Sequence, residues 1–96
     1  MIDIQFEWDE GKSRENKRKH GVSFEEAQTV FFDEKAIRFS DPDHSTDEDR
    51  FIMLGISFQL RVLVVCRCFR AGDAIIRIIS ARKSTRTEET EYWKWR

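Results

Sequence analysis

The 96 residues suffice for one small domain, and a hydrophobic content of 40% with 12% aromatics supports a compact core. No apolar run approaches the ~20 residues of a membrane-spanning helix, and the acidic start MIDIQFEWDE lacks the apolar region of a signal peptide. We therefore expect a single domain over residues 1–96 that is cytoplasmic and has no membrane partner.

The net charge of −1 conceals a separation of signs along the chain. Residues 12–20 carry five cations against one carboxylate, and residues 61–86 carry seven against one. Residues 33–49 instead carry seven carboxylates against two cations. Such a distribution is compatible with a mixed solvated surface, or with one cationic face that binds a polyanion.

The chain begins with a predicted strand and a polar helix. Residues 2–8 alternate apolar and polar side chains, as a half-buried strand does. Asp9 is expected to cap a helix that runs to about Lys19, with Gly21 as its C-terminal stop. Because this helix has no wide apolar stripe, contacts other than apolar packing must hold it.

A second helix is predicted from the capping-box pattern of Ser23 and Glu26, and it ends near Asp33. A short strand over residues 36–40 follows. The acidic sequence DPDHSTDED at residues 41–49 predicts a turn or loop.

Three further strands are predicted, over residues 50–58, 61–69 and 74–83. The segment RVLVVCRCF at 61–69 is the most strongly β-forming and is expected to be central. Residues 71–73, Ala-Gly-Asp, are expected to form a hairpin turn.

The pattern of Thr85 and Glu88 opens a C-terminal helix that runs to about Trp95. The predicted order is β-α-α-β-β-β-β-α. Because short turns join consecutive strands in antiparallel fashion, we expect an α+β two-layer fold. Its antiparallel sheet has about four to five strands, with two N-terminal helices and one C-terminal helix.

Cations gather where the last predicted strand meets the last helix. Simple alternation places Arg77 and Lys83 on one face and Arg82 on the other. Arg77, which lies between isoleucines, is either an exposed or ion-paired side chain or part of a phosphate clamp. Arg82, Lys83 and Arg86 surround the start of the helix, where free backbone N–H groups also favour an anion.

Four other polar side chains admit a structural or a chemical role. Glu88 and Tyr92 share one helix face, but Glu88 also completes a capping box and Tyr92 can pack on the sheet. His44 is either a surface residue or a proton-transfer group, and the aspartates around it favour imidazolium. His20 is expected to cap the carbonyl groups at the end of its helix.

No metal or cofactor is predicted. Cys66 and Cys68 have no further cysteine or histidine nearby that would complete a zinc site, so two reduced thiols on one strand are expected. The aspartates at residues 41–49 lack the glycine and terminal glutamate of an EF-hand loop.

Three segments together resemble the BrnT family, the toxins of BrnT–BrnA type II toxin–antitoxin modules. They are FEWDEGKSRENKRKHGVSFEEAQTVFFD, DHSTDEDRFIMLGIS and IIRIISARKSTRTEETEYW, in the family order and without large gaps. The matching residues are Lys12, His20, Gly21, His44, Arg50, Gly55, Arg77, Ser80, Arg82, Glu88 and Tyr92. The final WKWR departs from the pattern.

The resemblance implies a ribonuclease toxin with a RelE-like fold that cleaves RNA and inhibits translation. Its implied partner is a BrnA-like antitoxin, a ribbon-helix-helix dimer that covers the toxin. The complex would repress its own operon, so operator DNA would be contacted only through the antitoxin.

The residue types suit RNA cleavage without a metal. Attack of the 2′-OH on the adjacent phosphate needs a base, positive charge on the phosphorane and an acid for the leaving oxygen. We assign Arg77 and Arg82 to the phosphate, Glu88 or His44 to the base, and Tyr92 to base stacking or proton transfer. The further RNA-binding cations are Lys12, Arg50, Lys83 and Arg86.

Two other functions compete with this one. The first is a non-catalytic module that binds an antitoxin and acts as a co-repressor, but the presence of His44, Glu88 and Tyr92 favours the enzyme. The second is direct DNA binding, which the net charge of −1 and the lack of a helix-turn-helix pattern disfavour.

Overall fold

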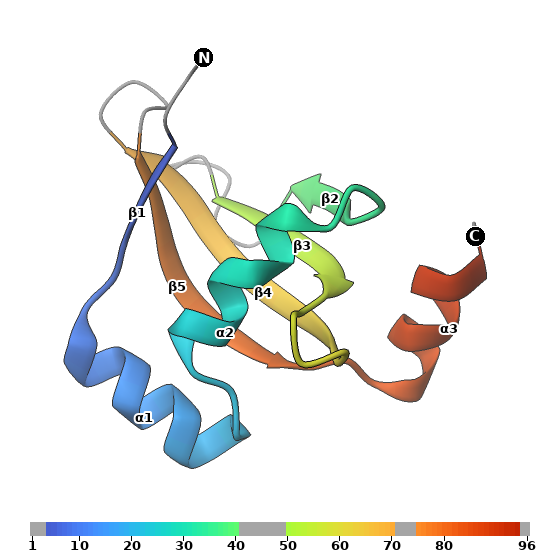
Figure 1. Cartoon of the computed structure of the whole chain (residues 1–96), viewed down its shortest axis with the longest axis horizontal. Coiled ribbons are helices and arrows are strands. Elements are labelled where there is room, and N and C mark those ends of the chain that lie inside the picture. The colour runs from blue at the N-terminus through green and yellow to red at the C-terminus, as the bar shows by residue number, and fades with distance from the viewer. Residues whose placement is uncertain (1–3, 41–49, 71–74, 95–96) are drawn as a thin grey trace.

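The computed structural model of the chain describes residues 4–40, 50–70 and 75–94 (Figure 1). Its elements are β1 (Gln5–Glu7), α1 (Glu10–His20), α2 (Phe24–Thr29), the 3₁₀ helix η1 (Val30–Phe32), β2 (Ile37–Ser40), β3 (Arg50–Ile56), β4 (Val62–Arg70), β5 (Ile75–Lys83) and α3 (Arg86–Lys94). The predicted element order and α+β class are confirmed. His44, the acidic segment 41–49, the turn at 71–73 and Trp95 lie outside the described residues.

The five strands form one sheet in the order β1-β5-β4-β3-β2. Strands β2 to β5 pair antiparallel, as predicted, whereas β1 runs parallel to β5, with Gln5 opposite Ile75. The expectation of a wholly antiparallel sheet was therefore wrong for β1. Short turns fix the direction of consecutive strands only, and β1 reaches its neighbour β5 from the far end of the chain.

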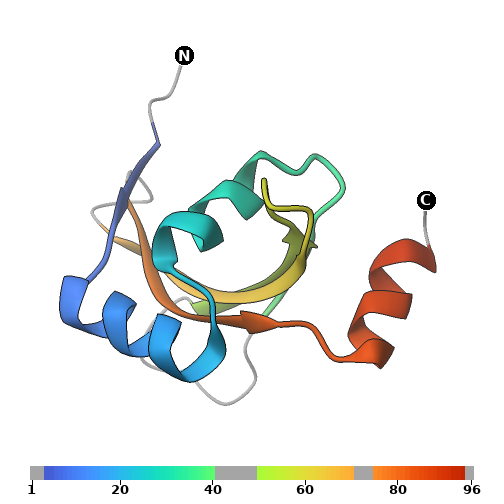
Figure 2. The same cartoon turned by 60° about the horizontal axis from the view of Figure 1, so that its bottom comes forward.

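Helix α2 lies over one face of the curved sheet, α1 lies beside β5, and α3 extends from the other end of the molecule (Figures 1 and 2). The core between α2 and the sheet consists of Val22, Phe24, Ala27, Val30, Met53, Leu63, Val65, Ile78 and Ala81, which are all buried. On the opposite face of the sheet, Tyr92 of α3 packs with Leu54, Val62 and Val64. This second face is therefore covered at the α3 end.

A β-bulge interrupts the pairing of β4 with β5. Cys66 is opposite Ser80, but the next residue, Arg67, is opposite Ile78. Ile79 is therefore an extra residue in β5, and an extra residue shifts the alternation of side chains between the two faces.

The bulge decides which cations share a face. Arg77 is opposite Cys68 and Arg82 is opposite Val64, and these two β4 residues are four positions apart. Arg77 and Arg82 therefore lie on the same face of the sheet, which corrects the simple alternation that separated them. Lys83, opposite Leu63, lies on the other face, toward the helices.

Arg67 places a guanidinium group inside the core, where its residue is only 4% exposed. Its Cζ lies 4.5 Å from the ring centre of Phe69, 5.0 Å from that of Phe51 and 5.7 Å from that of Phe31. Burial lowers the pKa of Arg67. The aromatic faces attract the cation and offset part of the cost of its burial.

Helix α1 is held to the sheet and to the start of α2 by side-chain hydrogen bonds, as its polar sequence requires. The Asn16 amide donates to the carbonyls of Val22 (2.8 Å) and Ala81 (2.7 Å), and its oxygen accepts from Ala81 N–H (3.2 Å). Ser13 Oγ accepts from the N–H of Phe24 at 3.1 Å. Polar contacts thus replace the missing apolar stripe.

We expect Asn16→Ala to lower the free energy of unfolding by about 2–4 kcal/mol, because it leaves three buried backbone groups without their partner. Urea denaturation followed by circular dichroism measures the change. Lys17→Ala, at an exposed position of the same helix, is the control and should cost less than ~0.5 kcal/mol. Equal losses in the two variants would contradict the anchoring role of Asn16.

A cationic face of the sheet as candidate active site

Two adjacent cavities open on the face of the sheet that carries Arg77 and Arg82. The Ser80 cavity, of about 290 Å³, is lined by His20, Arg50, Ile52, Val64, Cys66, Ile79, Ser80, Ala81 and Arg82. The Lys12 cavity, of about 270 Å³, is lined by Asp9, Lys12, Arg50, Cys68, Arg70, Arg77, Ile78 and Ile79. Because they share Arg50 and Ile79, the two cavities adjoin.

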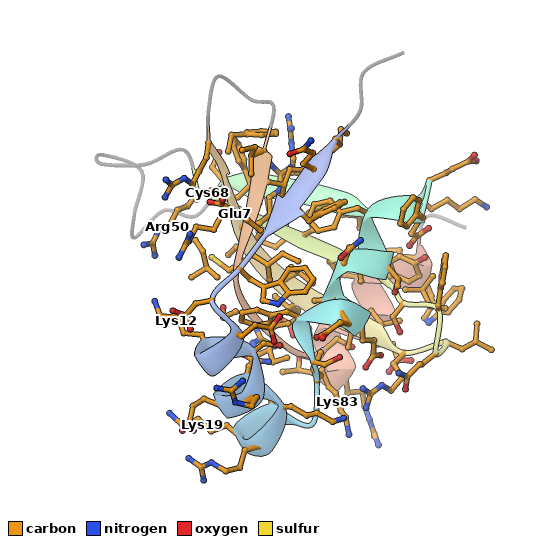
Figure 3. All side chains as sticks on the ribbon, turned by 60° about the vertical axis from the view of Figure 1, so that its left-hand side comes forward. Glu7, Lys12, Lys19, Arg50, Cys68 and Lys83 are labelled. Carbon is orange, nitrogen blue, oxygen red and sulfur yellow. The ribbon has the colours of Figure 1, made fainter. Side chains whose placement is uncertain are left out.

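Helix α1 contributes to both cavities because it runs alongside them. Lys12, in its first turn, lines one cavity, and His20, its last residue, lines the other. Arg50 begins β3 and lines both. Figure 3 shows Lys12 and Arg50 on one side of the molecule, with Cys68 and Glu7 near Arg50, and Lys83 well away from them.

In the Lys12 cavity, two guanidinium groups share one carboxylate. Glu7 of β1 accepts from Arg77 Nη1 at 3.2 Å and forms an ion pair with Arg70 Nε at 3.1 Å. A hydrogen bond from the backbone of Lys12 is the largest cause of the lowered pKa of Asp9. Positive charge is in excess, since the four lining cations, Lys12, Arg50, Arg70 and Arg77, outnumber Asp9 in the lining and Glu7 beside it.

In the Ser80 cavity, Arg82 is held by Glu88. Its Nη1 and Nη2 donate to the two carboxylate oxygens at 2.8 and 2.9 Å. Glu88 also accepts from Thr85 N–H at 2.8 Å and donates its own N–H to Thr85 Oγ1 at 3.2 Å, so the predicted capping box is confirmed. Chiefly through Arg82, these bonds lower the pKa of Glu88 to about 2.

The lowered pKa predicts how stability depends on pH. The Glu88 carboxylate stabilises the fold above its ordinary pKa of 4.5, and this contribution is lost as pH falls toward about 2. Since the pair is partly exposed, we expect Glu88→Gln to cost on the order of 1 kcal/mol at pH 7. Urea denaturation of both proteins should show the difference shrinking as the pH falls below 4.5. A difference that does not change with pH would contradict this assignment.

Besides Glu88, which contacts the lining residue Arg82, three described residues from the predicted site line neither cavity. Tyr92 is 2% exposed, and its hydroxyl donates to Asp33 Oδ2 at 2.5 Å, so it connects α3 to the end of η1. Lys83 lies on the opposite face of the sheet, beside Gly21. Arg86 lines a shallow groove formed by residues of α3 itself.

The cavities also include residues for which the sequence predicts no role in the chemistry. His20 was expected to cap its helix, yet it lines the Ser80 cavity with Arg50 and Arg82. Arg70 lines the Lys12 cavity. Arg70, Cys66 and Cys68 alternate along β4, so their side chains lie on the cavity face. This alternation is the sequence pattern from which Arg70 could have been predicted.

Among the described residues, no group of three His, Cys, Asp or Glu side chains is arranged to hold a metal ion. In the same segments, no helix is both long enough and apolar enough to cross a membrane.

Two cation-lined cavities on one sheet face of a small α+β domain have the charge that suits a polyanion. The family model of BrnT, the ribonuclease toxin of type II toxin–antitoxin systems, matches residues 8–88. The chain therefore belongs to the BrnT family of ribonuclease toxins.

The crystal structure of the Brucella abortus ribonuclease toxin BrnT is similar to this chain, with a TM-score of 0.66 and 24% sequence identity. The match covers 88% of this chain and 100% of that one, and at this identity it shows the fold alone. The comparison with curated proteins finds no match. The likeness to RelE-type toxins stays a prediction.

Proposed function

We propose that this chain is a metal-independent endoribonuclease that cleaves RNA by attack of its 2′-OH and thereby inhibits translation. The observation that supports this most is the convergence of Arg50, Arg77 and Arg82 on one face, beside His20. These cations come from two strands, and His20 comes from the end of α1. Arginine donors placed around a phosphate stabilise the charge that develops during its attack.

The reaction needs no group from outside the chain and the RNA. The 2′-oxygen forms a bond to phosphorus, the bond to the 5′-oxygen breaks, and a 2′,3′-cyclic phosphate and a 5′-hydroxyl result. Arg77 and Arg82 would bind the phosphate, and Lys12 and Arg50 would hold the neighbouring backbone. One group must take the proton from the 2′-OH, and another must protonate the leaving oxygen.

Histidine is better suited than Glu88 to these proton transfers. A carboxylate with a pKa of about 2 is a weak base near neutral pH, and both Glu88 oxygens are occupied by Arg82. We therefore assign Glu88 to positioning Arg82. His44 stays the base proposed from the sequence, and His20, in the Ser80 cavity, is the second candidate.

The family implies an antitoxin partner, and we propose that it is a BrnA-like ribbon-helix-helix dimer. This antitoxin would cover the toxin in the cytoplasm, and the complex would contact operator DNA through the antitoxin alone. Lys83 and Arg86, which lie outside both cavities, stay proposed RNA-binding residues whose cations can equally contact an acidic antitoxin segment.

Growth arrest and RNA integrity in cells expressing the chain, with and without the neighbouring reading frame, test the function. Purified Arg77→Ala, Arg82→Ala, His44→Ala and Glu88→Ala are then compared with the unchanged chain on RNA. If all four variants are folded and remain fully toxic, the proposed site is wrong. Purified protein that binds RNA without cutting it would favour a non-catalytic co-repressor instead.

A further inference from the structure

The two cavities differ in chemistry although they adjoin. The Lys12 cavity is dominated by charged side chains, namely Asp9, Lys12, Arg50, Arg70 and Arg77. The Ser80 cavity has an apolar floor, made of Ile52, Val64, Cys66 and Ile79. Polar groups complete its lining, and these are His20, Arg50, Ser80 and Arg82.

The ion pairs increase this difference. Both oxygens of Glu88 bind Arg82, so one carboxylate offsets one guanidinium in the Ser80 cavity, and Arg82 keeps its other N–H donors for the phosphate. At the Lys12 cavity, by contrast, two carboxylates, Asp9 and the Glu7 that pairs with Arg70 and Arg77, stand against the four cations Lys12, Arg50, Arg70 and Arg77. A phosphate group gains most from the cavity with excess positive charge, which is the Lys12 cavity.

The Ser80 cavity has the features of a site for a flat, largely apolar ring. Small-molecule sites combine an apolar lining with a few polar groups that fix orientation, and about 290 Å³ lies near the lower end of their range. Histidine and arginine provide planes on which a nucleobase can stack. The Ser80 hydroxyl is exposed and can both donate and accept a hydrogen bond at the base edge.

We infer that the Ser80 cavity binds one nucleobase of the RNA, and that the Lys12 cavity binds the phosphate backbone beside it. Arg50 lines both cavities, so it would contact the RNA between the bound base and the neighbouring phosphate. Ile79, the bulged residue of β5, separates the two subsites. This inference rests on the proposed ribonuclease function and adds to it a preference for one base next to the cleaved bond.

NMR titration of the full chain distinguishes the two subsites. The probes are inorganic phosphate and the four nucleoside 3′-monophosphates. Phosphate should shift the signals of Lys12, Arg70 and Arg77. At least one nucleotide should in addition shift those of Ile52 and Val64.

Two variants match the two cavities. Cys66→Met fills the floor of the Ser80 cavity and should weaken nucleotide binding by at least about tenfold, without changing phosphate binding. Lys12→Gln should weaken both ligands. The signals of residues packed against α2 report whether Cys66→Met keeps its fold. Ser80→Ala is a smaller change and should alter which of the four nucleotides binds best.

The inference is overturned if nucleotides shift only the signals that phosphate shifts, or if Cys66→Met weakens phosphate and nucleotide equally. RNA cleavage is measured alongside, so that the two failures are distinguishable. If the chain cleaves RNA without any base preference, the base subsite is overturned but the proposed ribonuclease function stands. Absence of both cleavage and phosphate binding overturns the proposed function itself.

Discussion

RNA cleavage by Arg77→Ala is expected to fall by about 10²–10³-fold, because the variant lacks a guanidinium group that, on the proposed assignment, binds the phosphate where charge develops. Arg77 lines the Lys12 cavity and is fixed by Glu7 at 3.2 Å. That ion pair is partly exposed, with one third of each side chain accessible to solvent, so its loss should change stability by at most ~1 kcal/mol. Activity should therefore fall in a protein that remains folded.

Lys83→Ala is the matched control for Arg82→Ala, because the two cations are neighbours in β5 and point to opposite faces. Arg82→Ala should lose as much RNA cleavage as Arg77→Ala. Lys83→Ala should lose only a few-fold, as expected for the loss of one peripheral phosphate contact. Cleavage rates on a labelled RNA, with stability checked in urea, measure all three. Equal losses for Arg82→Ala and Lys83→Ala would mean that overall charge matters rather than this face.

Glu26→Ala should lower the free energy of unfolding by about 3–4 kcal/mol, the largest effect on stability that we expect. The Glu26 side chain is 3% exposed, accepts from Ser57 Oγ at 2.7 Å and from Arg61 Nε at 2.9 Å, and also pairs with Arg61 Nη2. Burial raises the pKa of Glu26, but the bonds from Arg61 and Ser57 outweigh it, and the pKa is lowered overall. In the alanine variant, the donors of Arg61 and Ser57 lose their acceptor.

Urea denaturation at pH 7 measures this loss. Glu34→Ala, at an exposed position, is the control and should change stability by less than ~0.5 kcal/mol. Because the Glu26 carboxylate is the stabilising form, its contribution should decline as pH falls below its ordinary pKa of 4.5. A loss under ~1 kcal/mol would show that Arg61 and Ser57 find other partners at little cost.

The fold was largely predictable because its signals are local. Asp9 caps α1 by accepting from Lys12 N–H at 3.0 Å, and Gly21 ends that helix with a φ of 72°. The parallel pairing of β1 was not predictable in this way, since it joins opposite ends of the chain. Likewise, Ser23 caps α2 as predicted, but the carboxylate of Glu26 contacts Ser57 and Arg61, which are distant in sequence.

The site was predictable in its residue types and less so in its geometry. The sequence identified Arg50, Arg77 and Arg82, which all line the cavities, and Lys12 with them. It could not place Arg77 and Arg82 on one face, because a bulge depends on pairing with β4 rather than on β5 alone. The role of Tyr92 could not be decided from the sequence for a similar reason, since its hydroxyl binds Asp33, which is distant in sequence.

The contact of Asn16 with Ala81 also covers part of the outer edge of β5. The pairing of β1 with β5 ends at Glu7 and Arg77, whereas β5 continues to Lys83. The outer edge of β5 beyond Arg77 therefore has no neighbouring strand among the described residues. There the Asn16 amide occupies both the N–H and the carbonyl of Ala81. An uncovered strand edge is a template for pairing between molecules. One asparagine of α1 thus occupies the backbone groups of Ala81 that β1 leaves open at this edge of the sheet.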